Sequence, residues 1–180
     1  MINLGTAIAS PEFGAMGTDS EIELRYTDFE SMYVAEYPAM IAVATVWSGA
    51  DGEDLVHDAM VRAFVRWRDV SRLERPGGWC HRVLLNLCRS WWRRGRTRRR
   101  WLERQRPPEP ATIGWSAETS AFWAAVRTLP ERPREVVTLF YAADQPVAEI
   151  ARILAVPEGT VRSDLTRARA ALARVLEESS

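Results

Sequence analysis

Residues 147–172 read VAEIARILAVPEGTVRSDLTRARAAL, and their spacing predicts two helices joined by a short turn. In the first helix, the apolar residues that fall on one side are Ile150, Ile153 and Leu154. In the second helix, the apolar stripe is made of Val161, Leu165, Ala168 and Leu172. A turn with Pro157 and Gly159 separates the two stripes, so the pair is a candidate helix-turn-helix.

The outer face of the second helix carries short polar and arginine side chains: Arg162, Ser163, Thr166, Arg167 and Arg169. Such a face fits the major groove of DNA, where an arginine can hold a guanine edge through two hydrogen bonds. An ordinary surface helix with solvated arginines has the same spacing. Spacing alone therefore leaves both interpretations open.

The rest of the chain also has helical periodicity, and strand-like alternation is not evident. Two further helices are predicted over 116–129 and 133–143, and residues 104–120 before them are rich in proline, as in an interdomain linker. The predicted fold is therefore all-α. It is divided into a disordered leader or tag over 1–20, a small helical domain over 21–103, a proline-containing linker over 104–118 and a second helical domain over 119–180.

Local signals in the first domain predict where its first two helices begin and end. Thr27 and Glu30 have the spacing of a capping box, and Pro38 predicts a kink or break. Asp51 is placed to cap the next helix. The apolar stripe of that helix is predicted to contain Leu55, Val56, Ala59, Ala63 and Phe64.

A third helix is predicted from Trp79 to about Arg94, after a loop that ends in Pro76-Gly77-Gly78. Its sequence runs into NLCRSWWRRGRTRRRW, residues 86–101, where two tryptophans meet a cluster of arginines. Trp91 shares a stripe with Leu84, Leu87 and Cys88, which favours a core position. Trp92 lies at the margin of that stripe, beside the arginines.

Charge is distributed unevenly along the chain, although the formal net charge is zero. Residues 1–56 carry one arginine and ten acidic residues, whereas residues 57–106 carry fifteen arginines and four acidic residues. Residues 107–180 carry eight arginines and ten acidic residues. This asymmetry indicates that the middle third meets a polyanion.

The cysteines and histidines do not form a recognisable site. On one helix, Cys80 and Cys88 would lie about 12 Å apart along the axis, too far for a disulfide. Together with His57 and His81 they lack the paired spacing of a zinc site and the ordered partners of a catalytic centre. We therefore expect two small buried hydrophobic residues in a reducing cytosol, with no metal or cofactor. The sequence also lacks an apolar run of membrane-spanning length and an evident secretory signal.

The pattern Val147-x-Glu-Ile-Ala followed by Val156-Pro-x-Gly-Thr-Val-Arg-Ser-x-Leu-x-Arg-Ala resembles the region 4 helix-turn-helix of bacterial RNA polymerase sigma factors, most closely those of the extracytoplasmic-function (ECF) group. Leu129-Pro-Glu-Arg and the helix to Tyr141 resemble the segment that precedes it in that family. Residues 53–58, Glu-Asp-Leu-Val-His-Asp, resemble the polymerase-binding helix of region 2. Residues 79–94 resemble the helix that opens and reads the −10 element, and the Trp-Trp-Arg-Arg ending is similar to that of the actinobacterial SigE-like subgroup.

The resemblance implies a role for each motif. Core polymerase binding would fall to Asp54, Leu55, Asp58 and Arg62. Contacts with the −10 element would come from Trp79, Arg82, Asn86, Arg89, Trp92, Arg93, Arg94 and Arg96. Contacts with the −35 element would come from Glu158, Thr160, Arg162, Ser163, Thr166 and Arg167. Aromatic side chains would receive unstacked bases and arginines would hold the single strand.

The sequence departs from the family pattern at several positions. His57 stands where glutamine is usual, and Cys80-His81 stands where a longer side chain or an aromatic residue is common. Asp164 and Thr166 occupy recognition-helix positions that are often basic or histidine. We expect Asp164 to weaken phosphate contact locally.

The function implied is that of a sigma factor that directs core RNA polymerase to promoters and opens the −10 element, without chemistry of its own. Its expected partners are core RNA polymerase and promoter DNA, both double-stranded and melted, in the cytoplasm; an anti-sigma protein is a further candidate, and neither a membrane nor a small-molecule substrate is expected. One alternative is a free-standing helix-turn-helix regulator, which residues 27–100 disfavour because they lack alternating strands and a phosphoacceptor pattern. The other is an arginine-rich RNA-binding enzyme or adaptor, for which no catalytic constellation is found.

Overall fold

The computed structural model describes residues 26–102 and 116–178, and every regular element in these ranges is helical. The N-terminal elements are α2 (Phe29–Ser48), the short 3-10 helix η1 (Gly49–Asp51), α3 (Gly52–Val65), α4 (Trp67–Val70) and α5 (Pro76–Leu102). The C-terminal elements are α6 (Ala117–Thr128), α7 (Glu131–Tyr141), α8 (Val147–Leu154) and α9 (Glu158–Glu178). The all-α prediction is confirmed; the leader at 1–20 and most of the linker at 104–118 lie outside the described residues.

Helix α2 begins at Phe29, and the predicted Thr27–Glu30 capping box is wrong. Asp28 is the N-cap: its carboxylate accepts a hydrogen bond from the backbone N–H of Ser31 at 2.8 Å. In return, the Ser31 hydroxyl oxygen accepts the backbone N–H of Asp28 at 3.2 Å. Aspartate is a stronger N-cap than threonine, so the start of the helix moves one residue along the chain.

Of the kink or break predicted at Pro38, the break is wrong, because α2 continues through this residue to Ser48. Proline removes the hydrogen bond to the carbonyl four residues earlier, here that of Val34. Both Pro38 and Val34 are exposed, so water can reach the side of the helix where the bond is missing. The missing hydrogen bond therefore lies on the exposed face of α2, where water can bind the Val34 carbonyl group instead.

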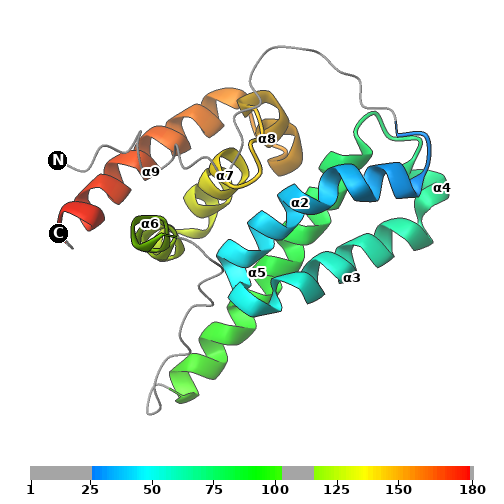
Figure 1. Ribbon diagram of the computed structural model, residues 1–180. Helices are drawn as coiled ribbons and strands as arrows, with labels where there is room; N and C mark the ends of the chain where they lie inside the picture. The colour runs from blue at the N-terminus through cyan, green and yellow to red at the C-terminus, as the bar shows by residue number, and fades with distance from the viewer. Residues whose placement is uncertain (1–25, 103–115, 179–180) are drawn as a thin grey trace.

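Helices α2, α3 and α5 pack side by side around a common apolar centre, as Figure 1 shows. Its buried members include Met40, Val43, Trp47, Val56, Ala59, Met60, Leu84, Leu85 and Cys88. The two cysteines are free thiols in this core, as predicted. Phe64 was expected in the same stripe but is 64% exposed, because it lies at the end of α3. Its ring meets that of Phe29 in an edge-to-face pair with centroids 5.1 Å apart.

Helix α5 begins at Pro76, three residues before the predicted start, so Pro76-Gly77-Gly78 forms its first turn and not a loop. Proline suits this position because its missing N–H has no intrahelical partner there. The glycines are required by two carboxylates that approach the turn closely. A Cβ at Gly77 would collide with the carboxylate of Glu36 from α2, and one at Gly78 would lie 2.7 Å from Oε1 of Glu149 in α8.

The C-terminal helices form the second group, with the long α9 packed on α6, α7 and α8. The apolar stripes predicted for the helix-turn-helix are confirmed, since Ile150, Ile153, Leu154, Val161, Leu165, Ala168 and Leu172 are all buried. Helix α8 ends at Leu154, and its C-cap residue Ala155 has a left-handed backbone conformation with φ of 54°. That residue reverses the chain direction so that α9 can begin at Glu158.

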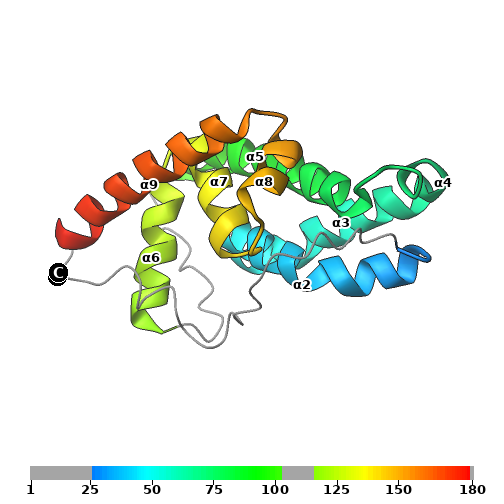
Figure 2. The same ribbon diagram turned by 90° about the horizontal axis from the view of Figure 1, so that it is seen from above.

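The two helical groups are packed against each other and their buried side chains form one continuous cluster. Helix α8 lies on the N-terminal part of α5, and α6 and α7 contact the end of α2. Figure 2 shows α7 and α8 lying beside α5 and α2, while α6 and the far end of α9 extend away from them. The sequence predicted two domains on a linker, and this contact between them was not foreseen.

A buried polar cluster fixes the start of α5 against α2. The Glu36 carboxylate accepts a hydrogen bond from the Tyr26 hydroxyl and lies 3.0 Å from Nε2 of His81, whose side chain is 2% exposed. Burial raises the pKa of Glu36, but the hydrogen bond and charge of His81 together with the Tyr26 hydrogen bond outweigh it, so the net pKa lies below the usual value of 4.5. Burial and the hydrogen bond to Glu36 raise the pKa of Tyr26.

The core packing predicts a large cost for truncating Leu84, which is fully buried between the three N-terminal helices. Leu84→Ala is expected to lower the free energy of unfolding by about 2–5 kcal/mol, because it removes buried methyl groups and leaves a cavity. Leu73→Ala, at a position that is 45% exposed, is the matched control and should cost less than about 0.5 kcal/mol. Urea unfolding followed by circular dichroism measures both; equal costs would contradict the assigned core.

The Glu36 cluster predicts a specific dependence of stability on acid. A carboxyl group whose pKa is lower in the folded than in the unfolded chain contributes stability above its unfolded pKa, near 4.5, and loses it as the pH falls through the folded pKa. Glu36→Gln should therefore be less stable than the natural chain by about 1–3 kcal/mol at pH 7. The difference should shrink below about pH 4.5; a difference that is constant from pH 7 to pH 3 would show that the charge of Glu36 contributes nothing.

Candidate nucleic-acid and protein interfaces

Helix α9 presents an exposed polar face along its first three turns. Buried Val161, Leu165 and Ala168 fix its rotation about its axis. The residues that this leaves outside include Glu158, Arg162, Ser163, Thr166 and Arg167, with Thr160 half-buried. All six residues expected to contact the −35 element therefore lie near one another on one helix.

The arginines of this face are already oriented by acidic neighbours. Nη2 of Arg162 lies 2.6 Å from the Glu158 carboxylate one turn earlier. Both side chains are exposed, with 64% and 45% of their surface accessible, so the pair orients the guanidinium more than it stabilises the helix. The hydroxyl groups of Ser163 and Thr166 donate to backbone carbonyls of the preceding turn.

Asp164, expected to weaken phosphate contact, does not lie on the outer face of α9. It is 6% exposed and belongs to the buried side of the helix. Its Oδ1 accepts a hydrogen bond from Nη2 of Arg167 at 2.9 Å. The aspartate therefore holds an exposed arginine in place and presents little negative charge to a ligand on the outer face.

Arg169, placed on the outer face from the spacing alone, belongs to the contact between α9 and α7. Its Nε donates to the Tyr141 hydroxyl at 2.8 Å, and the guanidinium lies over the rings of Phe140 and Tyr141, 5.6 and 5.8 Å from their centroids. This arginine therefore supports the position of α9 on its own domain.

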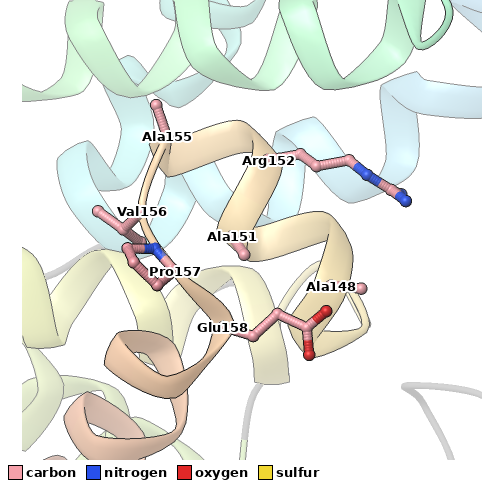
Figure 3. Close-up of a pocket in the computed structure, with 7 residues that line it drawn as sticks. All are labelled: Ala148, Ala151, Arg152, Ala155, Val156, Pro157 and Glu158. Carbon is pink, nitrogen blue, oxygen red and sulfur yellow. The ribbon is translucent and has the colours of Figure 1, made fainter.

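The turn before α9 encloses an open hollow between the two helices of the motif. Figure 3 shows it lined by Ala148, Ala151, Arg152, Ala155, Val156, Pro157 and Glu158. Five of these seven residues have small apolar side chains, and Arg152 points away from the hollow (Figure 3). Its Nη1 is paired with the Glu149 carboxylate at 3.1 Å. The small side chains keep the approach to the N-terminal end of α9 free of obstruction.

Some of the α5 residues expected to contact the −10 element are exposed, and others are half-buried. Arg82, Asn86, Arg93 and Arg94 are exposed, whereas Trp79, Arg89 and Trp92 are half-buried. Arg96 lies in the helix, but its side chain is outside the described residues, as are those of 98–100. Trp91 is half-buried against the core, and its Nε1 donates to Asp51 at 3.1 Å, which agrees with the core position favoured from the sequence.

Arg89 is held by the C-terminal domain. Its Nε donates to the carboxylate of Glu135 in α7 and lies 3.5 Å from that of Glu131, while Nη1 donates to Asn86 at 2.9 Å. The hydrogen bond to Glu135 is the main cause that raises the pKa of the guanidinium. Glu135 is 1% exposed, so this ion pair is shielded from water on the acidic side.

Trp92 is covered by an arginine that the sequence did not single out. The guanidinium of Arg134 lies 4.1 Å from the centroid of the Trp92 ring and 4.7 Å from that of Trp47. The two tryptophan rings meet edge to face, 6.2 Å apart. Neither Trp47 nor Arg134 carries a local signal for this contact, because they come from α2 and α7 and meet only in the packed fold.

Helix α3 presents a continuous outer stripe that alters the expected polymerase-binding set. Leu55 is 8% exposed and belongs to the core, so little of its side chain is available to a docking partner. Asp54 is exposed, and Asp58 and Arg62 form a two-bonded ion pair of 2.9 and 3.0 Å. Val61 and Val65 continue this stripe at the same helical spacing, and they are 44% and 77% exposed. The sequence did not predict them as surface residues, because an exposed apolar residue cannot be told from a core residue by its type.

Residues 26–102 and 116–178 contain no helix that has both the length and the apolar character needed to cross a lipid bilayer. Within the same ranges, histidine, cysteine, aspartate and glutamate side chains do not gather into a group of three that would hold a metal ion.

The two helical groups match two known families. Residues 32–99 match the family described as Sigma-70 region 2, and residues 119–172 match the one described as Sigma-70, region 4. The matched ranges correspond to the groups α2–α5 and α6–α9 and follow one another in that order.

Curated relatives are sigma factors. The chain is 33% identical to the ECF RNA polymerase sigma factor SigM of Mycobacterium tuberculosis, over 76% of this chain and 69% of that protein. It is 29% identical to the RNA polymerase sigma-E factor of Streptomyces coelicolor, over 71% of each chain. It is also 29% identical to the probable RNA polymerase sigma factor RfaY of Xanthomonas campestris, but the match spans only 35% of that protein's length.

A solved structure has the same fold. It is the sigma factor RpoE in complex with the anti-sigma factor NepR from Bartonella quintana, with a TM-score of 0.64 and 24% identity over 83% of this chain and 96% of that one.

Proposed function

The chain belongs to the ECF group of RNA polymerase sigma factors, which direct core polymerase to promoters, and from this premise we propose which of its surfaces does what. Helix α9 reads the −35 element, α5 engages and opens the −10 element, and the outer stripe of α3 docks on core polymerase. The observation that carries the proposal is that two exposed basic helix faces, α5 and α9, lie on two separate helical groups of one chain.

Reading of the −35 element rests on the arginines of α9. Arg162 and Arg167 are exposed on its first three turns, and each is oriented by an acidic neighbour, Glu158 or Asp164. An arginine that holds a guanine edge with two hydrogen bonds contributes about 1–3 kcal/mol of discrimination against the wrong base pair. Because each guanidinium group is already held in one orientation before DNA binds, less conformational freedom of the arginine side chains is lost on binding.

Opening of the −10 element rests on the Trp and Arg side chains of α5. Unstacking a base step costs a few kcal/mol. Stacking of a flipped base on an aromatic ring returns about 1–3 kcal/mol, and arginines hold the strand through its phosphates. Trp79 and Trp92 are candidate stacking rings, and Arg82, Arg93 and Arg94 are exposed for phosphate contact.

Docking on polymerase rests on the stripe of Asp54, Asp58, Val61, Arg62 and Val65. Its two acidic residues lie in the first half of α3 and its exposed valines in the second half, on either side of Arg62, an arrangement that suits a partner with a basic rim and an apolar centre. The polymerase then holds both DNA-binding surfaces at a fixed spacing. Each surface can bind weakly, because the high effective concentration of the second raises the affinity of the whole.

The alternative of a free-standing helix-turn-helix regulator does not account for the match of residues 32–99 to Sigma-70 region 2. We propose further that the chain catalyses no reaction and acts in the cytoplasm, where its polymerase partner is found. An anti-sigma protein is a candidate partner, since the similar sigma factor of Bartonella quintana was solved with one.

Run-off transcription with core polymerase on a promoter library tests the whole proposal. The purified chain should direct initiation from a subset of templates that share two elements at fixed spacing. If core polymerase starts from no template in its presence, the proposed function is wrong.

Arg162→Ala tests the −35 surface. Loss of a two-bonded base contact should reduce initiation at promoters that depend on the −35 element by about tenfold. Arg174→Ala removes an exposed arginine from the end of the same helix and should have little effect. Single-round transcription measures both variants; an equal loss for Arg162→Ala on templates without a −35 element would contradict base reading by this residue.

Val65→Asp tests the polymerase-docking stripe. Placing a charge in the apolar part of an interface should weaken binding to core polymerase by about tenfold or more. Leu73→Asp, an equivalent change at an exposed residue outside α3, is the control. Fluorescence anisotropy with labelled chain measures the affinity, and unchanged binding by the α3 variant would remove the stripe from the interface.

A further inference from the structure

The face of α5 that carries Arg89 and Trp92 is occupied by the chain's own C-terminal domain. Arg134 of α7 lies over the rings of Trp92 and Trp47, 4.1 and 4.7 Å from their centroids. Cation–π contacts of this geometry stabilise most when they are shielded from water, and Arg134 is 5% exposed. The face of the Trp92 ring that Arg134 covers is closed to a DNA base.

The same helix α7 also neutralises Arg89. Its guanidinium donates to Glu135, which is 1% exposed, and lies 3.5 Å from Glu131. A guanidinium paired with two carboxylates cannot at the same time hold a phosphate with its full charge. Two side chains of the −10 set are therefore engaged by one turn of α7.

A third contact lies at the opposite end of the interface. Glu149 of α8 is 3.5 Å from Nη1 of Arg75 and packs directly against Gly78, in the first turn of α5. A carboxylate is favoured there by the partial positive charge of the helix N-terminus. From Gly78 to Trp92 the C-terminal domain follows about 21 Å of α5.

The chemistry of these contacts makes them reversible. Glu135 and Glu149 are buried because the two domains meet, and Coulomb attraction in such pairs is largely offset by the loss of hydration. When the domains separate, each of these charges regains water. The charged pairs therefore add only a modest free energy to the contact, and a second ligand of the same surface can replace them.

We propose that the surface formed by Trp47, Arg89 and Trp92 is a docking site with two mutually exclusive ligands, single-stranded DNA of the −10 element and helix α7 of the same chain. This inference rests on the proposed role of Arg89 and Trp92 in −10 binding. In the closed chain α7 imitates the strand: Arg134 takes the place of a stacked base and Glu131 and Glu135 take the place of phosphates. The apparent affinity of the free chain for single-stranded DNA is therefore the affinity of the open form multiplied by the fraction of molecules that are open.

The test uses the full chain and two variants that loosen the contact from opposite ends, Arg134→Gln and Arg75→Gln. Arg174→Gln is the control, because it removes one exposed positive charge from α9 away from the interface. The probe is a fluorescein-labelled pool of single-stranded 12-nucleotide DNA with random sequence. All three variants lose one positive charge, so ordinary electrostatics predicts weaker binding for each.

The inference predicts the opposite sign for the interface variants. Arg134→Gln should bind the pool about fivefold more tightly than the natural chain and Arg75→Gln about twofold more tightly, whereas Arg174→Gln should bind slightly less well. If Arg134→Gln and Arg75→Gln both bind no better than Arg174→Gln, the shared surface is refuted. Arg134 also donates to the Leu129 carbonyl at 2.8 Å, so if thermal unfolding shows that its variant is not folded, Arg75→Gln decides.

The distance between the domains provides an independent readout. Nitroxide labels on Ser71→Cys and Ala170→Cys, both exposed positions, report it by electron spin resonance. The natural thiols are buried, and burial raises the pKa of Cys80 to about 12, so they react slowly with the label. Arg134→Gln, and addition of the DNA pool to the natural chain, should each populate a longer distance; DNA that binds without any change in distance would overturn mutual exclusion.

Transcription separates this inference from the function on which it rests. If the natural chain with core polymerase initiates from promoters but the interface variants show no gain in DNA affinity, only the inference fails. If the natural chain initiates from no promoter, the proposed function fails, whatever the variants do.

Discussion

Helix α5 packs against two neighbours at once, the N-terminal helices α2 and α3 and the C-terminal domain, and the arrangement of the whole chain depends on these two contacts. On one side Leu84, Leu85 and Cys88 are buried in the N-terminal bundle. On the other side the C-terminal domain contacts the helix from Gly78 to Trp92 through the charged side chains of Glu149, Arg134 and Glu135, with Ile153 beside Gly78. The apolar side fixes the helix permanently, since its exposure to water would cost several kcal/mol. The polar side can be exchanged, because its charges are well hydrated when uncovered.

This difference explains how tryptophan and arginine can share one short segment. Trp91 turns inward, packs on the core and donates to Asp51. Trp92 lies one residue further round the helix, between the N-terminal bundle and Arg134. The two adjacent side chains thus belong to different contacts, one structural and one available for exchange, although they look equivalent in the sequence.

Acidic residues have a positioning role throughout the structure. Glu36 ties α2 to His81, Glu149 meets the first turn of α5, and Asp164 orients Arg167. In a chain whose basic residues are all arginine, each of these acids fixes one guanidinium or imidazole in direction. A net charge of zero therefore does not mean that DNA binding is weak, because many negative charges face inward or toward a partner within the chain.

The local sequence was sufficient for the helical content, the position of the helix-turn-helix and the buried stripe of α9, because these depend on periodicity and on the neighbours one or two turns away. It was not sufficient where distant segments compete for the same side chain. Phe64 and Leu55 have equally apolar character, and only the end of α3 and the packing of α2 and α5 place one outside and the other inside. In the same way, the inward turn of Asp164, the pairing of Arg89 and the cover over Trp92 depend on which residues of other helices come within 3 to 5 Å, and the packing of the two domains decides that.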